Sequence, residues 1–586
     1  MKDLQKEKEL VDEDTHARYN ICPTYPAKGE IWEGFDTLAI HMATYQICLL
    51  DGYIGVNWPG FVEGLKRAFQ KLGKEVQFVS AQEAMLPSEE VADKVAPFLG
   101  GDDPLFGFKT SLSLTDFFDG EKLDAMIPKA PDVPTVIYGC GAALCRVQAP
   151  ILYVDLPKNI IQQRMRAGLV RNLGASKQTD NKQTYKRFYF VDWVVLNQHK
   201  KNLLPKIEVM VDQQMPDTIT WMLGTDLRDT LSEMAGSYFR VRPWFEPGVW
   251  GGQWLKNHLK ELDQRVDNYA WSFEMIVPEN GIVLAGGENK LEISFDQLMF
   301  WEGEKVLGKA HGRFGDDFPI RFDFLDTYEG GNLSIQCHPS ASYIKKHFGE
   351  HFTQDETYYI VDCEEDAEVY LGFQENIDPQ RFRSALEQSF ERNEELDIAE
   401  YVQKFPSKKH ELYLIPNGTV HASGKNNLVL EISATPYIFT FKMYDWLRPD
   451  LDGNPRPLNI ERAFENLDFS RKGDVVTDTL ITRAEVTRID EQSSLVHLPT
   501  HPVHFYDVYR YDFDKVVEIT TDGQCHVLML VEGEAIELTT LDGHRTVFNH
   551  IETFAVPAAA KAYKLRNLGN QQAKVIVAFV KNEALV

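Results

Sequence analysis

The stretch SIQCHPSASYIKKHFGEHFTQDETYY (Ser334–Tyr359) and the later stretch IPNGTVHASGKNNLVLEI (Ile415–Ile432) carry the most informative pattern of this chain. Gln336 and His338 stand two residues apart, so on a β-strand their side chains share one face and can approach a single ion. Cys337 then points to the opposite face, where we expect it to be a buried apolar filler. The two stretches together predict a β-rich metal site.

Four side chains in these stretches have the chemistry of metal ligands: Gln336, His338, Glu356 and His421. Two imidazoles, a carboxylate and an amide oxygen suit zinc, or iron, manganese or cobalt, and suit calcium poorly. Taken singly, His338 or Glu356 is more often an ordinary core or surface residue. The Pro-x-Gly-x-x-His turn from Pro416 to His421 favours the metal because it resembles the second motif of the cupin barrel.

The resemblance extends over residues 240–586, which look like the class I mannose-6-phosphate isomerase family. The segments that carry it occur in the family's order: RPWFEPGVWGG (Arg242–Gly252), FPIRFDFLD (Phe318–Asp326), LSIQCHPS (Leu333–Ser340), DETYYIVD (Asp355–Asp362), the turn already quoted, and KMYDW (Lys442–Trp446). The resemblance implies a zinc-dependent cupin that converts mannose 6-phosphate into fructose 6-phosphate. It also implies that the four predicted ligands are the family's zinc ligands.

The rest of the family's pocket carries over only in part. Its matching residues are Trp250, Ser334 and Glu431. Asp323 and Gln354 stand where the family usually has lysines, and Lys442 stands where it has an arginine. Two cations are thus replaced by an acid and an amide. At Lys442, an ammonium group replaces a guanidinium group that can form paired hydrogen bonds with a phosphate. We expect weaker phosphate affinity, with Asp323 and Gln354 as substrate-contacting positions.

Three other cations are candidates to compensate: Arg321, Lys425 and Arg448. Of these, Arg321 is expected to face away from Asp323 on its strand. An acidic residue of the family is replaced by Ser272, and Glu274 is a candidate to take its place.

The chemistry implied by the resemblance moves a proton between neighbouring carbons of a sugar, which requires a positioned acid or base. Glu431 is the first candidate, because its apolar neighbours in LVLEI should raise its pKa. The alternative is that Glu431 only holds a metal ligand in place. Lys442 is the candidate for stabilising negative charge that develops during the reaction, and its alternative is an ordinary solvated lysine.

Length and composition fit a multidomain protein. The chain has 586 residues, a hydrophobic content of 43% and a formal charge of −27, from 88 acids and 61 bases. This charge argues against nucleic acid and anionic membranes as partners. We do not expect the densely charged start to be a signal peptide, and no apolar run reaches membrane-spanning length. Seven cysteines without paired spacing fit a reducing cytoplasm. The sequence leaves the oligomeric state open.

Residues 1–235 have a different hydrophobic pattern, which predicts a parallel α/β domain. Short apolar runs, at Gln46–Tyr53, Glu75–Ser80, Thr135–Gly141 and Ile151–Pro157, alternate with helical patterns such as Phe61–Gly73. The run YVDLPKNIIQQRMRAG weakly resembles nucleoside-kinase-like P-loop proteins. The loop at Gly60 lacks the lysine and hydroxyl of a phosphate-binding loop, so we favour a degenerate domain kept for packing or assembly over a nucleotide or sugar-phosphate sensor.

The remaining chain is expected to form a bicupin. Residues 236–495 would be the metal-binding half, with a helical insert at 376–405 that covers the barrel mouth or forms an exposed helix face. Residues 496–586 would be a second half without metal, because Ala559 and Lys561 stand where a ligand histidine is expected. His501, His504 and His526 are expected to be ordinary residues.

Three hypotheses follow for the function. The first is a zinc-dependent isomerase acting on mannose 6-phosphate or a close relative. The second is the same scaffold acting on an unphosphorylated or differently charged sugar, which Asp323, Gln354 and Lys442 favour. The third is a non-catalytic sugar-binding regulatory cupin.

Overall fold

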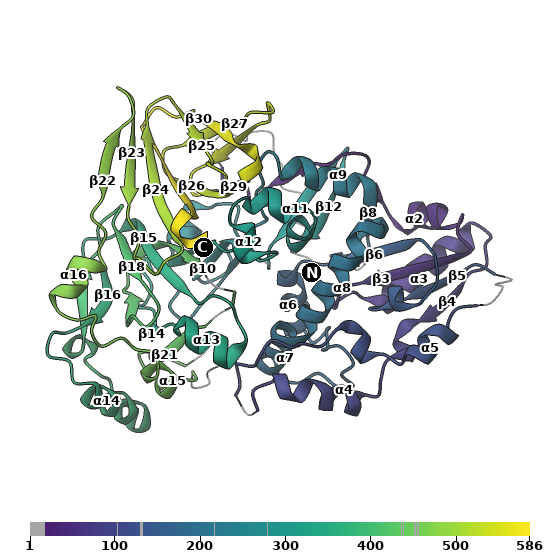
Figure 1. Cartoon of the computed structure of the whole chain (residues 1–586), viewed down its shortest axis with the longest axis horizontal. Helices are drawn as coiled ribbons and strands as arrows, with labels where there is room; N and C mark the ends of the chain where they lie inside the picture. Colours follow the sequence, from purple (N-terminus) through teal and green to yellow (C-terminus); the bar gives the residue numbers. More distant parts are fainter. Residues whose placement is uncertain are drawn as a thin grey trace.

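The computed structural model describes residues 18–585 except 102, 129–132, 216, 278, 435, 438, 450–452 and 454–455. Figure 1 shows an α/β part in purple and blue, made mainly by residues 32–236, beside a β-rich part in teal, green and yellow, made mainly by residues 237–585. Helices α6 (Lys158–Arg166) and α7 (Asn181–Arg187) lie on the side of the α/β part that faces the β-rich part. No helix in the described part of the chain is long and apolar enough to cross a membrane.

The α/β part is built on one seven-stranded sheet. Its strands, in spatial order, are β2 (Trp32–Glu33), β8 (Thr220–Leu223), β7 (Ile207–Asp212), β6 (Ile151–Asp155), β3 (Ile47–Gly52), β5 (Thr135–Tyr138) and β4 (Gln77–Ser80). β4, β5, β3, β6 and β7 are parallel, whereas β8 and β2 are antiparallel to their neighbours. Runs such as ICLLDG form central strands because helices cover both faces of such a sheet.

Helices alternate with these strands along the chain. They are α2 (Phe35–Met42), α3 (Trp58–Lys71), α4 (Ser88–Val95), α5 (Gly120–Ala125), α6, α7, α8 (Trp193–Leu203) and α9 (Gly224–Met234). α3 begins after Asn57, whose side chain accepts the N–H of Gly60, and Pro59 occupies its first turn. The strands and the helix expected from the sequence lie within a few residues of β3, β4, β5, β6 and α3.

Two antiparallel sheets form the centre of the β-rich part. The Glu356 sheet contains β18 (Leu412–Ile415), β15 (Asp355–Cys363), β20 (Asn427–Ala434), β13 (Arg321–Asp326), β10 (Trp271–Met275) and β9 (Trp244–Glu246). The His421 sheet contains β17 (Val402–Pro406), β16 (Glu368–Phe373), β19 (His421–Ser423), β14 (Ile335–Cys337) and β21 (Phe441–Tyr444). Their inner faces meet, since Glu356 of one sheet lies against His421 of the other. This arrangement is consistent with the expected cupin-like barrel.

The expected insert contains one long helix, α14 (Pro379–Arg392), capped by Asp378. Phe382 and Leu386 bury one face of α14, while an Arg383–Glu387 ion pair lies on its exposed face. β17 already begins at Val402 and pairs with β16, so the end of the expected insert is a strand of the His421 sheet. The insert boundary at 405 was therefore wrong: strand pairing, which sequence periodicity does not report, takes residues 402–405.

The C-terminal residues form two further antiparallel sheets. The first contains β22 (Glu485–Arg488), β23 (Ser493–Leu498), β24 (Tyr506–Phe513), β31 (Ala573–Val580), β26 (His526–Glu532) and β29 (Thr553–Val556). The second contains β25 (Val516–Thr520), β30 (Ala562–Asn567), β27 (Ala535–Thr540) and β28 (Arg545–Asn549). His526 contacts the Tyr563 hydroxyl, and His504 stacks on Tyr506. That these sheets are a second cupin half stays a prediction.

The two parts of the molecule share secondary structure and a buried ion network. β1 (Thr24–Pro26) pairs in parallel with β11 (Gly281–Gly286), which also pairs with β12 (Asn289–Ser294). Next to β12, Lys200 of α8 contacts Asp155 at 3.2 Å and Asp296 at 2.8 Å. Strand pairing and buried charge thus cross the boundary expected near residue 235.

Candidate active site

The structure brings the four predicted ligands together between the two central sheets. Gln336 lies on β14, His338 directly follows that strand, Glu356 lies on β15 and His421 begins β19. Glu356 Oε1 is 3.2 Å from His338 Nε2 and 2.7 Å from His421 Nε2. The Gln336 amide nitrogen is 3.3 Å from His421 Nε2. All four side chains are buried. Cys337 is also buried, as expected.

The histidine rings are held so that each turns Nε2 toward Glu356. His338 Nδ1 lies 3.0 Å from the carbonyl oxygen of Phe439, and His421 Nδ1 lies 2.9 Å from that of Thr419. Because a backbone carbonyl accepts the Nδ1 proton, the Nε2 lone pair is left for a cation.

A divalent metal ion fits this cluster. His338 Nε2 and Glu356 Oε1 are buried, and the contacts that they make are with the other members of the cluster. Polar atoms in that position are costly unless something charged or polar binds them. Within the part of the chain that the structure describes, His338, Glu356 and His421 are the one set of three His, Cys, Asp or Glu residues with ligand atoms within 4.8 Å of one another. Two imidazoles and a carboxylate beside an amide form a donor set that zinc accepts.

The turn before His421 depends on Gly418. Its backbone φ of 79° lies in the left-handed region, and a Cβ there would sit 2.6 Å from the carbonyl oxygen of Asn466. Glycine alone fits both constraints. The turn delivers His421 to the start of β19 with its ring inside the barrel.

A central pocket of about 340 Å³ adjoins the ligand cluster. The predicted site residues that line it are Trp250, Asp323, Ser334, Gln336, Gln354, Glu431 and Lys442. One wall is aromatic. The Trp250 and Trp271 rings meet edge to face with their centroids 4.6 Å apart, and the Trp244 and Phe273 rings stack with their centroids 4.5 Å apart. A concave, partly aromatic pocket with a few convergent polar groups is typical of a small-molecule site.

Two polar side chains of the pocket support the ligands directly. Gln354 Nε2 donates a hydrogen bond of 3.0 Å to Glu356 Oε2. The Ser334 hydroxyl donates one of 2.9 Å to Gln336 Oε1. Gln354 was expected to contact substrate, and it faces the pocket, but it also holds the carboxylate ligand in place.

Three carboxylates lie on neighbouring strands at the central pocket, and two of them, Asp323 and Glu431, line it. Glu431 on β20 pairs across the sheet with Asp323 on β13, and Glu356 follows on β15. Burial, the charge of Asp323 and that of Glu356 raise the pKa of Glu431 well above its ordinary value. Burial likewise raises the pKa of Asp323 to about 8, against the opposing charge of Arg321. Carboxyl groups of this kind are candidates for proton transfer near neutral pH.

Lys442 faces the same pocket from β21. Burial, together with the positive charge of Arg456, lowers the pKa of Lys442 to about 8. A solvated lysine has no reason to shift in this way, so the ordinary-lysine alternative does not describe this side chain.

The expectation for Arg321 was wrong. Residues two apart on a strand share a face, and both Arg321 and Asp323 line the central pocket. The guanidinium therefore acts on the Asp323 carboxyl through its charge. Lys425 lies elsewhere, since it is exposed and pairs with Asp366 at 2.7 Å.

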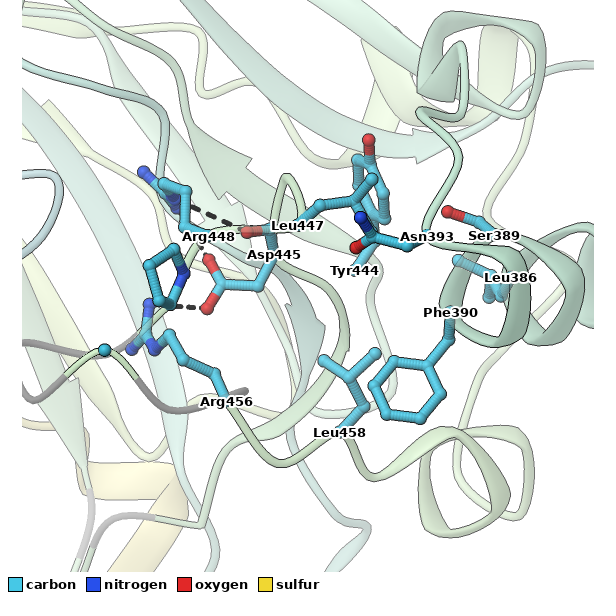
Figure 2. Close-up of a pocket in the computed structure, with 12 residues that line it drawn as sticks. Leu386, Ser389, Phe390, Asn393, Tyr444, Asp445, Leu447, Arg448, Arg456 and Leu458 are labelled. Carbon is cyan, nitrogen blue, oxygen red and sulfur yellow. Dashed lines mark hydrogen bonds and ion pairs between the residues drawn. The ribbon is translucent and has the colours of Figure 1, made fainter.

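Arg448 lines a different cavity of about 270 Å³, between α14 and the chain that follows β21. Figure 2 shows its guanidinium and that of Arg456 on either side of Asp445, at 2.6 Å and 2.5 Å. Arg448 is therefore engaged outside the central pocket. Its charge contributes to the lowered pKa of Lys442.

Glu274 does not take the place of the missing acid. Trp271 and Phe273 face the central pocket, so alternation along β10 turns Ser272 and Glu274 to the other side. There the Glu274 carboxylate accepts hydrogen bonds of 2.5 Å from Ser272 and from Tyr19.

The sequence analysis missed functional candidates on both parts of the molecule. Tyr358 lies cross-strand from Glu431, and burial together with the charge of Glu356 raises the pKa of its hydroxyl well above the ordinary value. Its spacing of two from Glu356 was a signal for it. Gln162 and Arg166 of α6 and Tyr185 of α7 also line the central pocket. No local pattern connects those three residues to the ligand stretches.

The loop after β3, which sits where a phosphate-binding loop would, borders a separate cavity of about 560 Å³. Asp51 at its start accepts the N–H groups of Gly141 and Ala143 and contacts His199 at 2.8 Å. The likeness to nucleoside kinases stays a prediction.

Comparisons with known proteins give two different results for the two parts. Residues 34–236 match a family model described as a domain of unknown function, DUF8485. The chain is 28% identical over 225 residues to mannose-6-phosphate isomerase ManA of Bacillus subtilis, covering 38% of this chain and 66% of that protein. It is 29% identical over 277 residues to the probable mannose-6-phosphate isomerase GmuF of the same organism, covering 46% and 78%.

A solved structure is also similar. The crystal structure of the mannose 6-phosphate isomerase from Bacillus subtilis superposes with a TM-score of 0.48 at 21% identity, covering 58% of this chain and 99% of that one. In sequence, this chain is thus similar to mannose-6-phosphate isomerases over roughly half of its length, and to a domain family without a described function over residues 34–236.

Proposed function

We propose that this protein is a metal-dependent aldose–ketose isomerase, with zinc as the expected ion and mannose 6-phosphate or a close relative as substrate. The observation that carries the proposal is the cluster of His338, Glu356 and His421, with Gln336 beside it, at the edge of a pocket that also holds Glu431 and Lys442. The similarity to mannose-6-phosphate isomerases, at low identity, supports a sugar isomerase function.

The chain's own groups suit a proton transfer between C1 and C2 of a sugar. An ion bound by the cluster would polarise the carbonyl and neighbouring hydroxyl oxygens and offset the charge of Glu356. Glu431 takes the proton from C2 and returns it to C1, while the hydroxyl proton on O2 passes to O1, so that the aldose becomes the ketose. Lys442 stabilises the negative charge that develops on these oxygens. Trp250 and Trp271 orient the sugar and exclude water.

Replacement of Glu431 by glutamine separates proton transfer from ligand support. We expect kcat for mannose 6-phosphate to fall about 10²- to 10⁴-fold, because the amide cannot take up the proton. Metal content, measured by inductively coupled plasma mass spectrometry, should stay at the wild-type level. A roughly 10- to 100-fold weaker metal affinity would instead assign Glu431 the role of holding a ligand.

The pH dependence of kcat should follow the protonation state of Lys442. The protonated amine is the form that stabilises negative charge, and its pKa is about 8. We therefore expect kcat to decline above pH 8 by up to tenfold per pH unit, and to change little from this group below pH 7. In Lys442→Arg the decline should vanish, since a guanidinium stays charged across this range. An unchanged alkaline limb in that variant would assign the decline to another group.

A second candidate function is isomerisation of an unphosphorylated sugar. It is favoured by Asp323, whose carboxyl faces the pocket where the family has a cation. The deciding assay incubates the metal-loaded protein with mannose 6-phosphate, fructose 6-phosphate, mannose and fructose, and follows isomerisation. Turnover of phosphate esters alone eliminates this second candidate. Tight sugar binding without any turnover would leave a binding protein.

A further inference from the structure

The central pocket is not made by the β-rich part alone. Gln162, Met165 and Arg166 of α6 line it together with Gln336 and Lys442. Positions 162, 165 and 166 follow the i, i+3, i+4 spacing of one helix face, so a single face of α6 forms this wall. The intervening Arg164 points away, where its guanidinium donates to the carbonyl oxygens of Gly55 and Gln213 at 2.6 Å each.

The wall is held firmly against the β-rich part. Gln162 Nε2 donates to Glu279 Oε2 at 2.7 Å, and the Tyr185 hydroxyl donates to Glu279 Oε1 at 2.9 Å. At the start of α6, Lys158 is buried and contacts Asp296 at 2.6 Å. These contacts fix α6 relative to the pocket, as a binding element requires.

Arg166 gives this wall a positive charge at the open end of the pocket. Its side chain is 49% exposed, whereas those of His338 and His421 at the ligand cluster are fully buried. Glu246 contacts two of its guanidinium nitrogens, at 2.8 Å and 3.4 Å. A guanidinium has five N–H donors, so this pair leaves donors for an anion. The pocket thus runs from a buried ligand cluster to an exposed rim, where the Arg166 guanidinium lies with the carboxylates of Glu246 and Glu279.

The two ends of the pocket match the two ends of a sugar phosphate. In a hexose 6-phosphate the reacting carbons C1 and C2 and the phosphate lie at opposite ends. Two cations of the β-rich part also line the pocket, but the charge of Arg321 acts on Asp323 and Lys442 is assigned to the reacting oxygens. The phosphate therefore needs a cation from another element. Arg166 is exposed, fixed in place and suited to the fork geometry of a phosphate.

We propose that α6 builds a phosphate subsite onto the isomerase pocket, with Arg166 as the residue that binds the phosphate of a hexose 6-phosphate. The inference rests on the proposed function for the orientation of the sugar. It gives residues 34–236, which match a domain of unknown function, a role in substrate selection.

The test measures binding, so that it does not depend on turnover. Glucitol 6-phosphate and glucitol have no carbonyl group and cannot be isomerised, and isothermal titration calorimetry of each with the metal-loaded full chain gives the two dissociation constants. We expect Arg166→Gln to raise the dissociation constant of glucitol 6-phosphate at least tenfold and to change that of glucitol less than twofold. Glu246→Gln removes a carboxylate that competes for Arg166. This variant should lower the dissociation constant of glucitol 6-phosphate severalfold.

Arg383→Gln is the matched control, because Arg383 also forms an exposed pair with a glutamate at 2.8 Å, on α14. It should leave both constants unchanged. Wild-type affinity for glucitol 6-phosphate in Arg166→Gln, or no preference of the wild-type protein for the phosphate ester, overturns the subsite. If binding depends on Arg166 but no sugar is isomerised, the subsite stands and the proposed isomerase activity fails.

Discussion

His421→Ala should release most of the metal and abolish isomerisation. The imidazole Nε2 lies 2.7 Å from Glu356 Oε1, and His421 is one of the three residues of the cluster among the described residues. Losing one of four ligands leaves the buried Glu356 carboxylate with less positive charge around it. Metal content after gel filtration should fall from about one ion per chain to a small fraction of that. Turnover of mannose 6-phosphate should fall to background.

The control for this experiment is His526→Ala. His526 is also a buried histidine, but it lies on β26 and contacts Tyr563 instead of the cluster. It should cost some stability and leave metal content unchanged. Full metal occupancy in His421→Ala would refute the ligand assignment. Equal metal loss in both variants would show that the measurement reports general destabilisation.

Lys200→Met should destabilise the folded protein strongly. The Lys200 amine is fully buried and contacts Asp155, Asp296 and the Ser294 hydroxyl, at 3.2, 2.8 and 2.7 Å. Methionine removes the charge and leaves two buried carboxylates that Lys158 alone cannot compensate. Breaking a buried ion pair in this way costs about 3–5 kcal/mol of unfolding free energy. Urea denaturation followed by far-ultraviolet circular dichroism measures it.

Lys201→Met is the neighbouring control. Lys201 is 46% exposed and forms a single ion pair of 2.6 Å with Asp316. An exposed pair contributes less than about 1 kcal/mol, so this variant should unfold close to the wild type. Similar losses in both variants would mean that the buried network does not stabilise the contact between α8 and the β-rich part.

Part of the predicted ligand cluster follows from short-range spacing, and the resemblance to the isomerase family supplied the rest. Gln336 and His338 are two residues apart, the turn before His421 needs Gly418, and Cys337 falls on the opposite face. Each is a local geometric rule, and the structure places these residues accordingly. The charge environment of Glu431 was only half predicted. Burial raises its pKa, as its apolar neighbours indicated, but Asp323 and Glu356 add to the shift from other strands.

The same rule failed where it was applied wrongly or not applied at all. Arg321 and Asp323 share a face because they are two apart, and Glu274 shares a face with Ser272, away from the pocket. Tyr358 follows Glu356 at the same spacing. These outcomes were available from alternation alone.

Arg166 belongs to a different class, because nothing near it in the sequence indicates a pocket. Its position depends on α6 docking against the β-rich part through Glu279 and Asp296.

The sequence by itself determined that Gln336 and His338 share a strand face and that a glycine turn precedes His421, since strand alternation and turn geometry act over a few residues. The resemblance to the isomerase family then selected the four predicted ligands. Only the tertiary structure decided what surrounds that cluster. Asp323, Glu431 and Lys442 meet across sheets, and Arg166 arrives from the α/β part. Those neighbours depend on how separate elements pack, and packing energy comes from contacts between residues far apart in the chain.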